Sequence, residues 1–182
     1  MCKNIFDGKE VVLAEMLDAR EKRAYRQRSL LERFTGASLL CATMNIPGPV
    51  KRSDVLAEVF ERLIKEIEEQ LSDKILFCKK LELETGDEYY LVSTLSPLDL
   101  KTVLVAIEDN SAYGRLVDLD VVELTDQQVT PISRTQLGLS PRTCYVCPAI
   151  AKECSRSRKH SVTEMQMAIA KLIRATGDFK TD

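Results

Sequence analysis

The 182-residue sequence lacks any apolar run that approaches the length of a membrane-spanning helix. Its first ten residues lack the apolar core of a signal peptide, so we expect a cytoplasmic protein that contacts no membrane. It also lacks a basic excess, because 26 Lys and Arg face 28 Asp and Glu, and we expect no nucleic-acid partner. In a reducing compartment, we expect the six cysteines to be free thiols or metal ligands rather than disulfides.

The length fits one domain, or one domain with a small appendage. The chain is 45% hydrophobic and 30% charged, which is typical of folded globular proteins. Apolar periodicity and turn residues predict helices over about 10–34, 54–71, 97–108 and a last stretch after Ser161, with strands over 37–46, 75–84, 89–94, 116–122 and 129–133. Helices that alternate with hairpins predict an α+β fold, with a mixed or antiparallel sheet and flanking helices.

Asp118 and Asp120 lie one residue apart in the expected strand over 116–122, which follows a tight turn at Gly114 and Arg115. Because side chains alternate along a strand, both carboxylates share one face with Leu116 and Val122. Two carboxylates this close repel each other unless a cation lies between them, and Mg²⁺ takes one or two carboxylates together with phosphate oxygens. The motif indicates metal-dependent phosphoryl or nucleotidyl transfer. On spacing alone, a half-exposed strand with two solvated acids is the simpler alternative.

Several basic side chains are candidates for holding phosphate groups. Arg20 and Arg23 lie in the middle of the first helix, and Lys51 follows a Gly/Pro-rich loop just before a helix capped by Ser53 or Asp54. Free backbone N–H groups and the helix dipole favour anions at such a helix start. The glycine spacing is not that of a Walker loop. A solvated helix face and a rigid turn with surface cations are the structural alternatives.

A second constellation consists of Cys144, Cys147, Cys154 and His160, the only histidine of the chain. The interval between Cys144 and Cys147 is that of a structural zinc knuckle. The interval between Cys154 and His160 is not that of a standard zinc finger. Two interpretations therefore stay open: a structural Zn²⁺ site, and buried thiols that pack a C-terminal subdomain.

The order of these motifs resembles a known family. The segments 114–121, 132–134, 140–147 and 154–156 and residue His160 follow one another as in apo-citrate lyase phosphoribosyl-dephospho-CoA transferase, the holo-citrate lyase synthase of bacterial citrate fermentation. The upstream segments 20–23 and 47–51 agree as well. The resemblance covers nearly the whole chain, and the combination is specific although each piece alone is weak.

The resemblance implies a nucleotidyltransferase that attaches the prosthetic group of citrate lyase to its acyl carrier protein, the gamma subunit. The donor would be triphosphoribosyl-dephospho-CoA. A serine hydroxyl of the carrier attacks the α-phosphorus, a phosphodiester forms and pyrophosphate leaves. A malonate decarboxylase carrier would allow the same chemistry. Two other functions compete: a zinc-stabilised, non-catalytic binding module, and a nucleotidyltransferase with a nucleoside triphosphate donor.

The resemblance also suggests roles for individual residues. Asp118 and Asp120 would hold Mg²⁺, and Arg115 is the candidate to pair with the pyrophosphate leaving group. His160, or a carboxylate such as Glu108, is the candidate base for the serine proton. A triphosphate is a dense anion that arginine binds bidentately, and the candidate substrate-binding residues are Arg20, Arg23, Lys51, Gly114, Arg134 and Arg142.

The expected organisation follows from these assignments. Residues 1–140 would form a nucleotidyltransferase-like α+β catalytic domain, and residues 141–182 a small Cys-rich helical extension packed on it. Mg²⁺ is the expected catalytic cofactor, and Zn²⁺ the expected structural one if the Cys/His cluster is a metal site.

Overall fold

The computed structural model describes residues 4–179, and within them the chain forms a five-stranded sheet and five α-helices. The sheet has the order β2-β3-β1-β4-β5, and every neighbouring pair is antiparallel. The α+β prediction is confirmed, and the sheet is antiparallel rather than mixed. The strands are β1 (Ser38–Met44), β2 (Ile75–Leu81), β3 (Glu88–Ser93), β4 (Val117–Thr125) and β5 (Gln128–Ile132). The helices are α1 (Leu13–Arg33), α2 (Asp54–Leu71), α3 (Pro97–Asn110), α4 (Ala151–Ser157) and α5 (Val162–Ala175).

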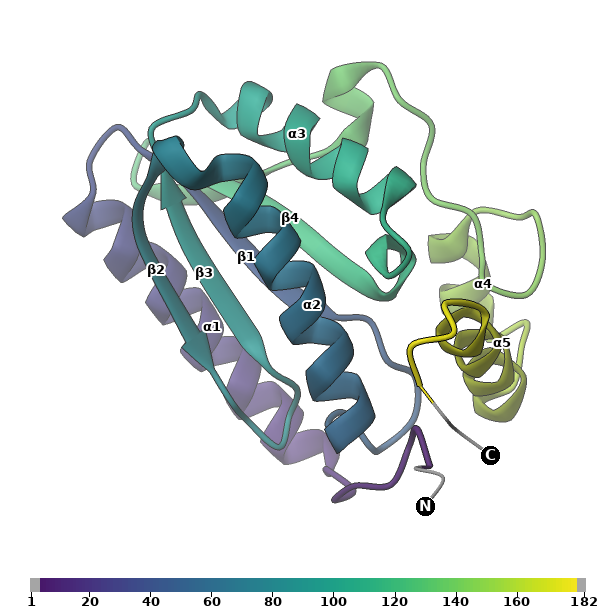
Figure 1. Cartoon of the computed structure of the whole chain (residues 1–182). Helices are drawn as coiled ribbons and strands as arrows, with labels where there is room; N and C mark the ends of the chain where they lie inside the picture. The colour runs from purple at the N-terminus through teal and green to yellow at the C-terminus, as the bar shows by residue number, and fades with distance from the viewer. Residues whose placement is uncertain (1–3, 180–182) are drawn as a thin grey trace.

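The helices lie on both faces of the sheet (Figure 1). Helices α2 and α3 cover one face, where the larger of two apolar clusters includes Leu40, Leu91 and Leu119. Helix α1 lies behind the sheet and covers the other face, where a smaller cluster includes Leu39 and Val122. The side chains divide between the two clusters because successive strand residues point to opposite faces.

Helix α2 shows how the sequence sets a helix boundary and its buried face. The Ser53 hydroxyl oxygen accepts a hydrogen bond from the Leu56 N–H at 3.2 Å and donates one to the Ile5 carbonyl at 2.6 Å. This N-cap satisfies a donor that the first helical turn leaves free. Apolar residues at helical spacing then bury one side of α2 against the sheet.

Helix α1 differs from α2, because only Ala19 and Leu31 are buried in it. Its middle part contacts the sheet through charged groups instead. Arg23 and Arg26 bind the two carboxylate oxygens of Glu88, at 3.0 Å and 2.9 Å, and the Glu88 side chain is fully buried. The face of the sheet under α1 is thus partly polar, and the candidate active site lies on it.

Strand β4 begins one residue later than expected. Gly114 and Arg115 lie in a turn, as predicted, but this 3-10 turn extends to Leu116, and β4 starts at Val117. Leu116 consequently packs in the cluster under α2 and α3, and the prediction that it shares the aspartate face is wrong. Val122 does share that face with Asp118 and Asp120.

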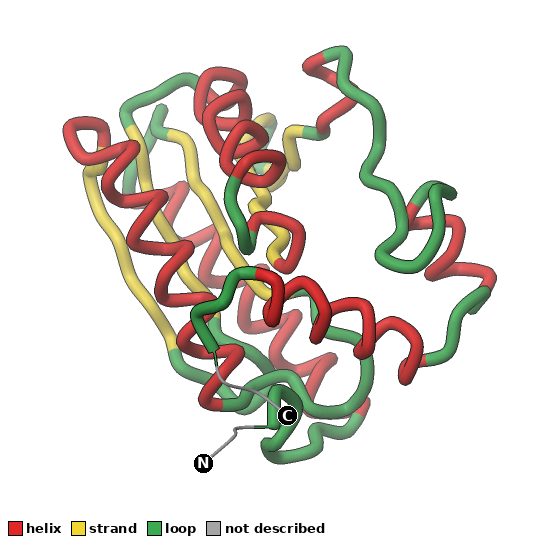
Figure 2. Tube along the Cα trace, turned by 45° about the vertical axis from the view of Figure 1, so that its right-hand side comes forward, coloured by secondary structure: helices red, strands yellow, loops and turns green. Residues whose placement is uncertain are grey.

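Helix α5 joins the main core through Ile169, Ala170 and Ile173. Helix α4, which the sequence did not predict, follows a long loop and is joined to α5 by a short one (Figure 2). Among the described residues, no helix is both long enough and apolar enough to cross a membrane.

Candidate active site

Asp118 lies in a cleft that four separate parts of the chain form. The cleft lies between the first half of α1, the end of β1 with the loop after it, the turn between β2 and β3, and β4. It holds about 570 Å³ when the space open to solvent at its mouth is counted. Four predicted site residues are among those that line it: Arg20, Arg23, Lys51 and Asp118. Side chains distant in sequence thus meet around one carboxylate.

Asp118 and Asp120 extend from the α1 face of β4, opposite Thr43 and Cys41 of β1. Partial burial raises the pKa of Asp118, and the neighbouring Asp120 charge raises it further. Arg142 and a hydrogen bond from Asn45 act against this rise. Burial also raises the pKa of Asp120, against the attraction of Lys101. Two carboxyls with raised pKa values indicate a local shortage of positive charge, which a bound cation would supply.

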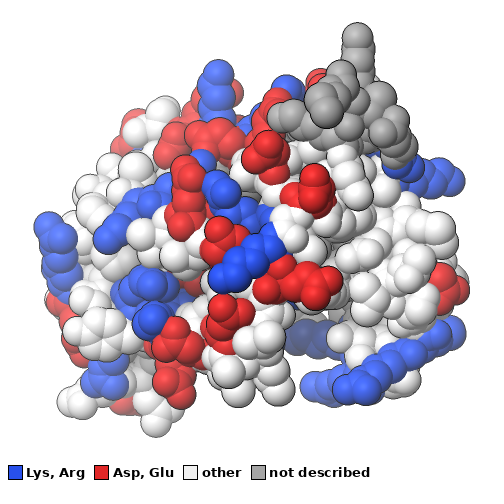
Figure 3. Space-filling view, turned by 90° about the horizontal axis from the view of Figure 1, so that it is seen from below, with Lys and Arg blue, Asp and Glu red and all other residues white. Residues whose placement is uncertain are grey.

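The cleft cations come from different elements. Lys51 donates to the Ile46 carbonyl at 2.6 Å, and burial together with nearby Arg20 lowers the pKa of Lys51. Arg23 is held by the buried Glu88. Over most of the face seen in Figure 3, basic and acidic side chains are interspersed. The net charge of the whole chain is -2, so it does not itself attract an anion, and the nearby cations of the cleft would have to do so.

Arg134 and Arg142 lie at the edge of β4, where they surround Glu108 of α3. Glu108 is 3% exposed, and its carboxylate oxygens lie 2.9 Å from Arg134 Nη1 and 2.6 Å from Arg142 Nη2. Arg142 also donates to the Val117 carbonyl at 2.6 Å and lies 3.3 Å from Asp118. With both its oxygens engaged in this way, Glu108 is poorly placed to accept a serine proton.

Gly114 and Arg115 lie in the turn that leads into β4. A Cβ atom on Gly114 would lie 2.5 Å from the carbonyl oxygens of Ile107 and Glu108, so a glycine is needed where this turn meets the end of α3. Arg115 donates to the Thr143 carbonyl at 2.7 Å, and its guanidinium carbon lies 5.2 Å from the ring centre of Tyr145. Gly114 thus packs the turn before β4 against α3, and Arg115 binds this turn to the loop that contains Thr143 and Tyr145.

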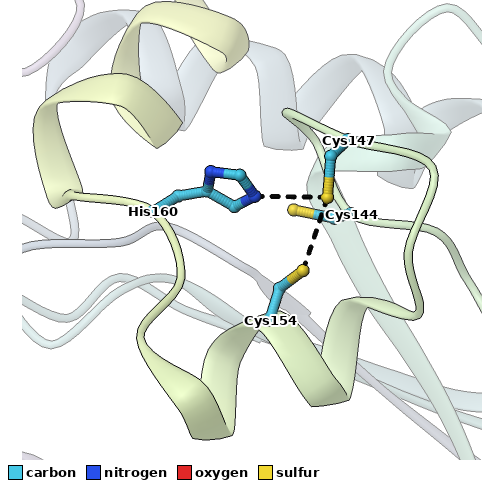
Figure 4. Close-up of side chains that lie close together, drawn as sticks. All are labelled: Cys144, Cys147, Cys154 and His160. Carbon is cyan, nitrogen blue, oxygen red and sulfur yellow. Dashed lines mark hydrogen bonds between the residues drawn. The ribbon is translucent and has the colours of Figure 1, made fainter.

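The Cys/His constellation forms one cluster. The sulfurs of Cys144, Cys147 and Cys154 and a ring nitrogen of His160 all lie within 4.8 Å of one another, an arrangement that can hold a metal such as zinc. Figure 4 shows the four side chains directed toward a common point. His160 contacts Cys147 at 3.2 Å and is not among the residues that line the cleft. Cys2 lies outside the described residues.

The sequence matches the family model of apo-citrate lyase phosphoribosyl-dephospho-CoA transferase over residues 11–176. The chain belongs to this family. It is 49% identical to the probable apo-citrate lyase phosphoribosyl-dephospho-CoA transferase of Streptococcus pyogenes serotype M18, over 96% of this chain and 92% of that protein. A protein of the same description from Vibrio cholerae serotype O1 is 33% identical over 93% of each chain. Protein CitXG of Haemophilus influenzae is 35% identical, over 87% of this chain and 34% of that longer protein.

Membership of the apo-citrate lyase phosphoribosyl-dephospho-CoA transferase family makes this chain an enzyme, a transferase of prosthetic-group biosynthesis. The resemblance predicted from the order of motifs is confirmed. A non-catalytic binding module, one of the alternatives that the sequence left open, is excluded.

Sequence reasoning missed two polar residues of this candidate site. Asn45 lines the cleft and hydrogen bonds Asp118. Lys101 of α3 is 5% exposed and donates to the Leu119 carbonyl at 2.7 Å, close to Asp120. The signal for Lys101 is its position beside Leu100 on the apolar side of a helix, where an unpaired lysine is rare. Asn45 had no comparable signal, because a polar residue after a strand is usually only part of a loop.

Proposed function

We propose that this transferase moves phosphoribosyl-dephospho-CoA from triphosphoribosyl-dephospho-CoA to a serine of the citrate lyase acyl carrier protein, the gamma subunit, and releases pyrophosphate. One observation carries the proposal. Asp118, with Asp120 beside it on β4, faces a cleft into which Arg20, Arg23 and Lys51 bring positive charge. A triphosphate donor needs cations along its phosphates and a metal site at the reacting phosphorus.

The reaction has a simple balance. A bond forms between the serine oxygen and the α-phosphorus, the bond from that phosphorus to the bridging oxygen breaks, and pyrophosphate leaves with the bonding electrons. The serine proton passes to water at the open mouth of the cleft. The protein positions the two reactants and neutralises charge on the leaving group, which is the larger part of catalysis in phosphoryl transfer.

In this proposal the cleft residues have different roles. Lys51 and Arg20 bind the departing phosphates, and Arg23, fixed by Glu88, keeps its positive charge near the aspartate pair. Arg115, Arg134 and Arg142 act from outside the cleft lining, where they hold the beginning of β4. This division differs from the direct phosphate contacts first expected for those three arginines.

Mg²⁺ is the metal that the aspartate pair fits. The donors are two carboxylates on one face of β4 with the Asn45 side chain beside them, and such hard oxygen ligands suit Mg²⁺. When bound there by Asp118 and Asp120, the ion would neutralise phosphate charge and lower the pKa of the attacking hydroxyl. His160 is assigned to the Cys/His cluster, and the second metal of the proposal, Zn²⁺, belongs there.

The proposal extends to the architecture and location of the enzyme. We treat residues 1–140 as a catalytic domain of nucleotidyltransferase-like design, because the aspartate pair lies on a strand of its antiparallel sheet. We treat residues 141–182 as an extension packed on it. We place the reaction in the cytoplasm.

The test is the intact mass of the carrier. The full chain is incubated with Mg²⁺, apo-carrier and triphosphoribosyl-dephospho-CoA, and the carrier should gain one phosphoribosyl-dephospho-CoA unit. A carrier with its acceptor serine replaced by alanine should gain nothing. A mass gain with ATP and none with triphosphoribosyl-dephospho-CoA would show a different donor. A parallel reaction with the malonate decarboxylase carrier measures the choice of acceptor.

A further inference from the structure

The chain between the sheet and the last helix has almost no apolar core. Between Ile132 and Ile169, the only buried side chains are those of Cys144 and Cys154. Helix α4 is seven residues long and is flanked by loops (Figure 2). A segment with so little apolar burial is commonly stabilised by a metal or a covalent crosslink. The cysteines of this segment are free thiols, which leaves a metal.

The four ligand atoms have the separations of a tetrahedral metal shell. Nε2 of His160 lies 3.2 Å from Sγ of Cys147, and that sulfur lies 3.5 Å from Sγ of Cys154. All four atoms, with Sγ of Cys144, lie within 4.8 Å of one another. A zinc tetrahedron with bonds of about 2.0 to 2.3 Å has edges of roughly 3.3 to 3.8 Å. Small side-chain movements would close this cluster around one ion.

The backbone around Cys144 is already ordered for metal binding. A β-bridge joins Thr143 to Ile150, and the Cys144 N–H donates to the Ala149 carbonyl at 2.8 Å. The Val146 N–H points at the Cys144 sulfur, 3.5 Å away. This tight loop sets Cys144 and Cys147 side by side, and α4 and the turn before α5 bring Cys154 and His160 to them (Figure 4).

We propose that Cys144, Cys147, Cys154 and His160 bind one structural Zn²⁺ ion, which fastens the 142–160 segment to the beginning of β4. Three thiolates and one imidazole in a tetrahedral arrangement favour zinc over Mg²⁺ or Ca²⁺. The protein fills all four positions, so no position stays open for water or substrate. Lys159 Nζ lies 3.8 Å from Sγ of Cys147 and offsets the net negative charge that three thiolates give the bound ion.

The consequence for the active site follows from the neighbours of Cys144. Arg142, two residues before it, binds the Val117 carbonyl and Asp118. The Thr143 carbonyl accepts from Arg115, and the Tyr145 hydroxyl donates to the Arg115 carbonyl at 2.7 Å. The loop that carries two zinc ligands therefore also holds residues 115–118. Loss of the metal should loosen the start of β4 and, with it, the position of Asp118.

Metal content is the first test. The full chain, prepared without a histidine tag and desalted after exposure to Zn²⁺, should contain close to one zinc per chain by mass spectrometry of the metal. Cys154→Ser should lower this several-fold, and the matched control Cys78→Ser, at an exposed thiol outside the cluster, should not. Less than about half a zinc per wild-type chain, or an equal loss in both variants, would overturn the proposal.

Cobalt provides a measurement that does not depend on how well a variant folds. Wild-type protein stripped of metal and titrated with Co²⁺ should show the intense visible bands of tetrahedral Co²⁺ and a sulfur-to-cobalt charge-transfer band, complete at one equivalent. Pale octahedral cobalt bands without charge transfer would mean that oxygen ligands hold the ion, and the assignment would then be wrong.

Hydrogen exchange tests the link to β4. Removal of zinc should speed amide exchange in residues 115–118 and 143–151, while the middle of α2 stays protected. Unchanged exchange at 115–118 would refute the fastening role. The carrier-modification rate should fall with the metal, and only this readout rests on the proposed function. Suppose that the protein binds one zinc and shows faster amide exchange at 115–118 after zinc removal, yet fails to modify the carrier. That result would contradict the proposed substrate and leave the metal site supported.

Discussion

Asp118 and Asp120, the proposed metal ligands, lower the stability of the fold at neutral pH. Burial raises the pKa of both carboxyls above the ordinary 3.8, so the folded chain binds protons more tightly there than the unfolded chain does. Stability is therefore highest below pH 3.8 as far as these groups are concerned, and it falls as the pH rises through their folded pKa values. A bound cation would recover what is lost at neutral pH.

The first prediction concerns this pair. Asp118→Asn and Asp120→Asn should each lower the carrier-modification rate by about 100-fold or more, because a charged metal ligand is lost. Each should also raise the melting temperature at pH 7, and the gain should vanish near pH 3, where the wild-type carboxyls are protonated. Mg²⁺ should raise the melting temperature of the wild type only.

The control for these variants is Asp126→Asn. Asp126 lies in the exposed turn between β4 and β5 with a φ of 49°, a backbone conformation that asparagine also adopts. This variant should keep wild-type activity and wild-type pH dependence. Full activity in the Asp118 and Asp120 variants would remove the basis for a metal site on β4.

The second prediction concerns the cleft cations. Arg20→Met and Lys51→Met should each raise the KM for the donor by about 10-fold or more, since charged hydrogen bonds to phosphate contribute about 1.5 to 3 kcal/mol. The effect should shrink at high salt. Lys65→Met, at a solvent-exposed lysine of α2, is the matched control and should leave the KM unchanged.

Lys51 also gives the donor affinity a pH dependence. Burial and the nearby Arg20 lower the pKa of Lys51 from 10.5, so its charge is present below that lowered value and is lost as the pH rises through it. Donor binding should therefore weaken on the alkaline side before ordinary lysines titrate. The same alkaline loss in Lys51→Met would contradict this assignment.

At the scale of elements, β4 is a strand with a half-open edge. Its pairing with β5 begins at Val121, so residues 117–120 need other partners on that side. The Leu119 N–H donates to Glu108 at 3.2 Å, and the Leu119 carbonyl accepts from Lys101. Side chains of α3 thus replace a neighbouring strand and keep the open edge from pairing elsewhere.

The third prediction follows from that replacement. Glu108→Gln should lower the free energy of unfolding by about 3 to 5 kcal/mol, because Lys101, Arg134 and Arg142 would lose the buried carboxylate that they share. Asp109→Asn is a close control, since exposed Asp109 binds the same Arg134, and its cost should stay below about 1 kcal/mol. Urea denaturation measures both, and equal effects would show that burial of the ion pairs does not matter.

Element types were predictable where local chemistry decides them. Helix α3 has Ser96 as its cap and Pro97 at its first position, and both are visible in the sequence. The turn at Gly114 was predicted, but its extension to Leu116 was not, because Gly114 packs against the end of α3, a contact between elements that no local pattern records. Helix α4 was missed because it is short and buries only Cys154, so it lacks an apolar repeat.

At the scale of the whole molecule, the sequence predicted the family better than it predicted where distant residues meet. The aspartate spacing and the order of motifs identified the family correctly. Strand order was out of reach, because β1 pairs with β3 and β4 through contacts distant in sequence. The strand order places Arg134 and Arg142 outside the lining of the cleft. It also places Glu88 of β3 under α1, where this carboxylate is the buried partner of Arg23.

The last prediction tests whether residues 141–182 form a separate unit. Ile173 of α5 is fully buried in the cluster that includes Leu63 of α2 and Leu104 of α3. Ile173→Ala should therefore lower the free energy of unfolding of the whole chain by about 2 to 5 kcal/mol within a single transition. Met167→Ala, at a 61% exposed position of the same helix, should change it by less than about 0.5 kcal/mol.

Urea unfolding followed by tyrosine fluorescence and by far-UV circular dichroism distinguishes the two arrangements. Coincident curves that shift together in Ile173→Ala would mean that α5 and the sheet fold as one cooperative unit. An early transition confined to part of the signal would mean that the C-terminal extension unfolds alone. Repeating the experiment after zinc removal separates the contribution of the metal from that of Ile173, because the apolar cluster that holds α5 includes none of the four side chains of the Cys/His cluster.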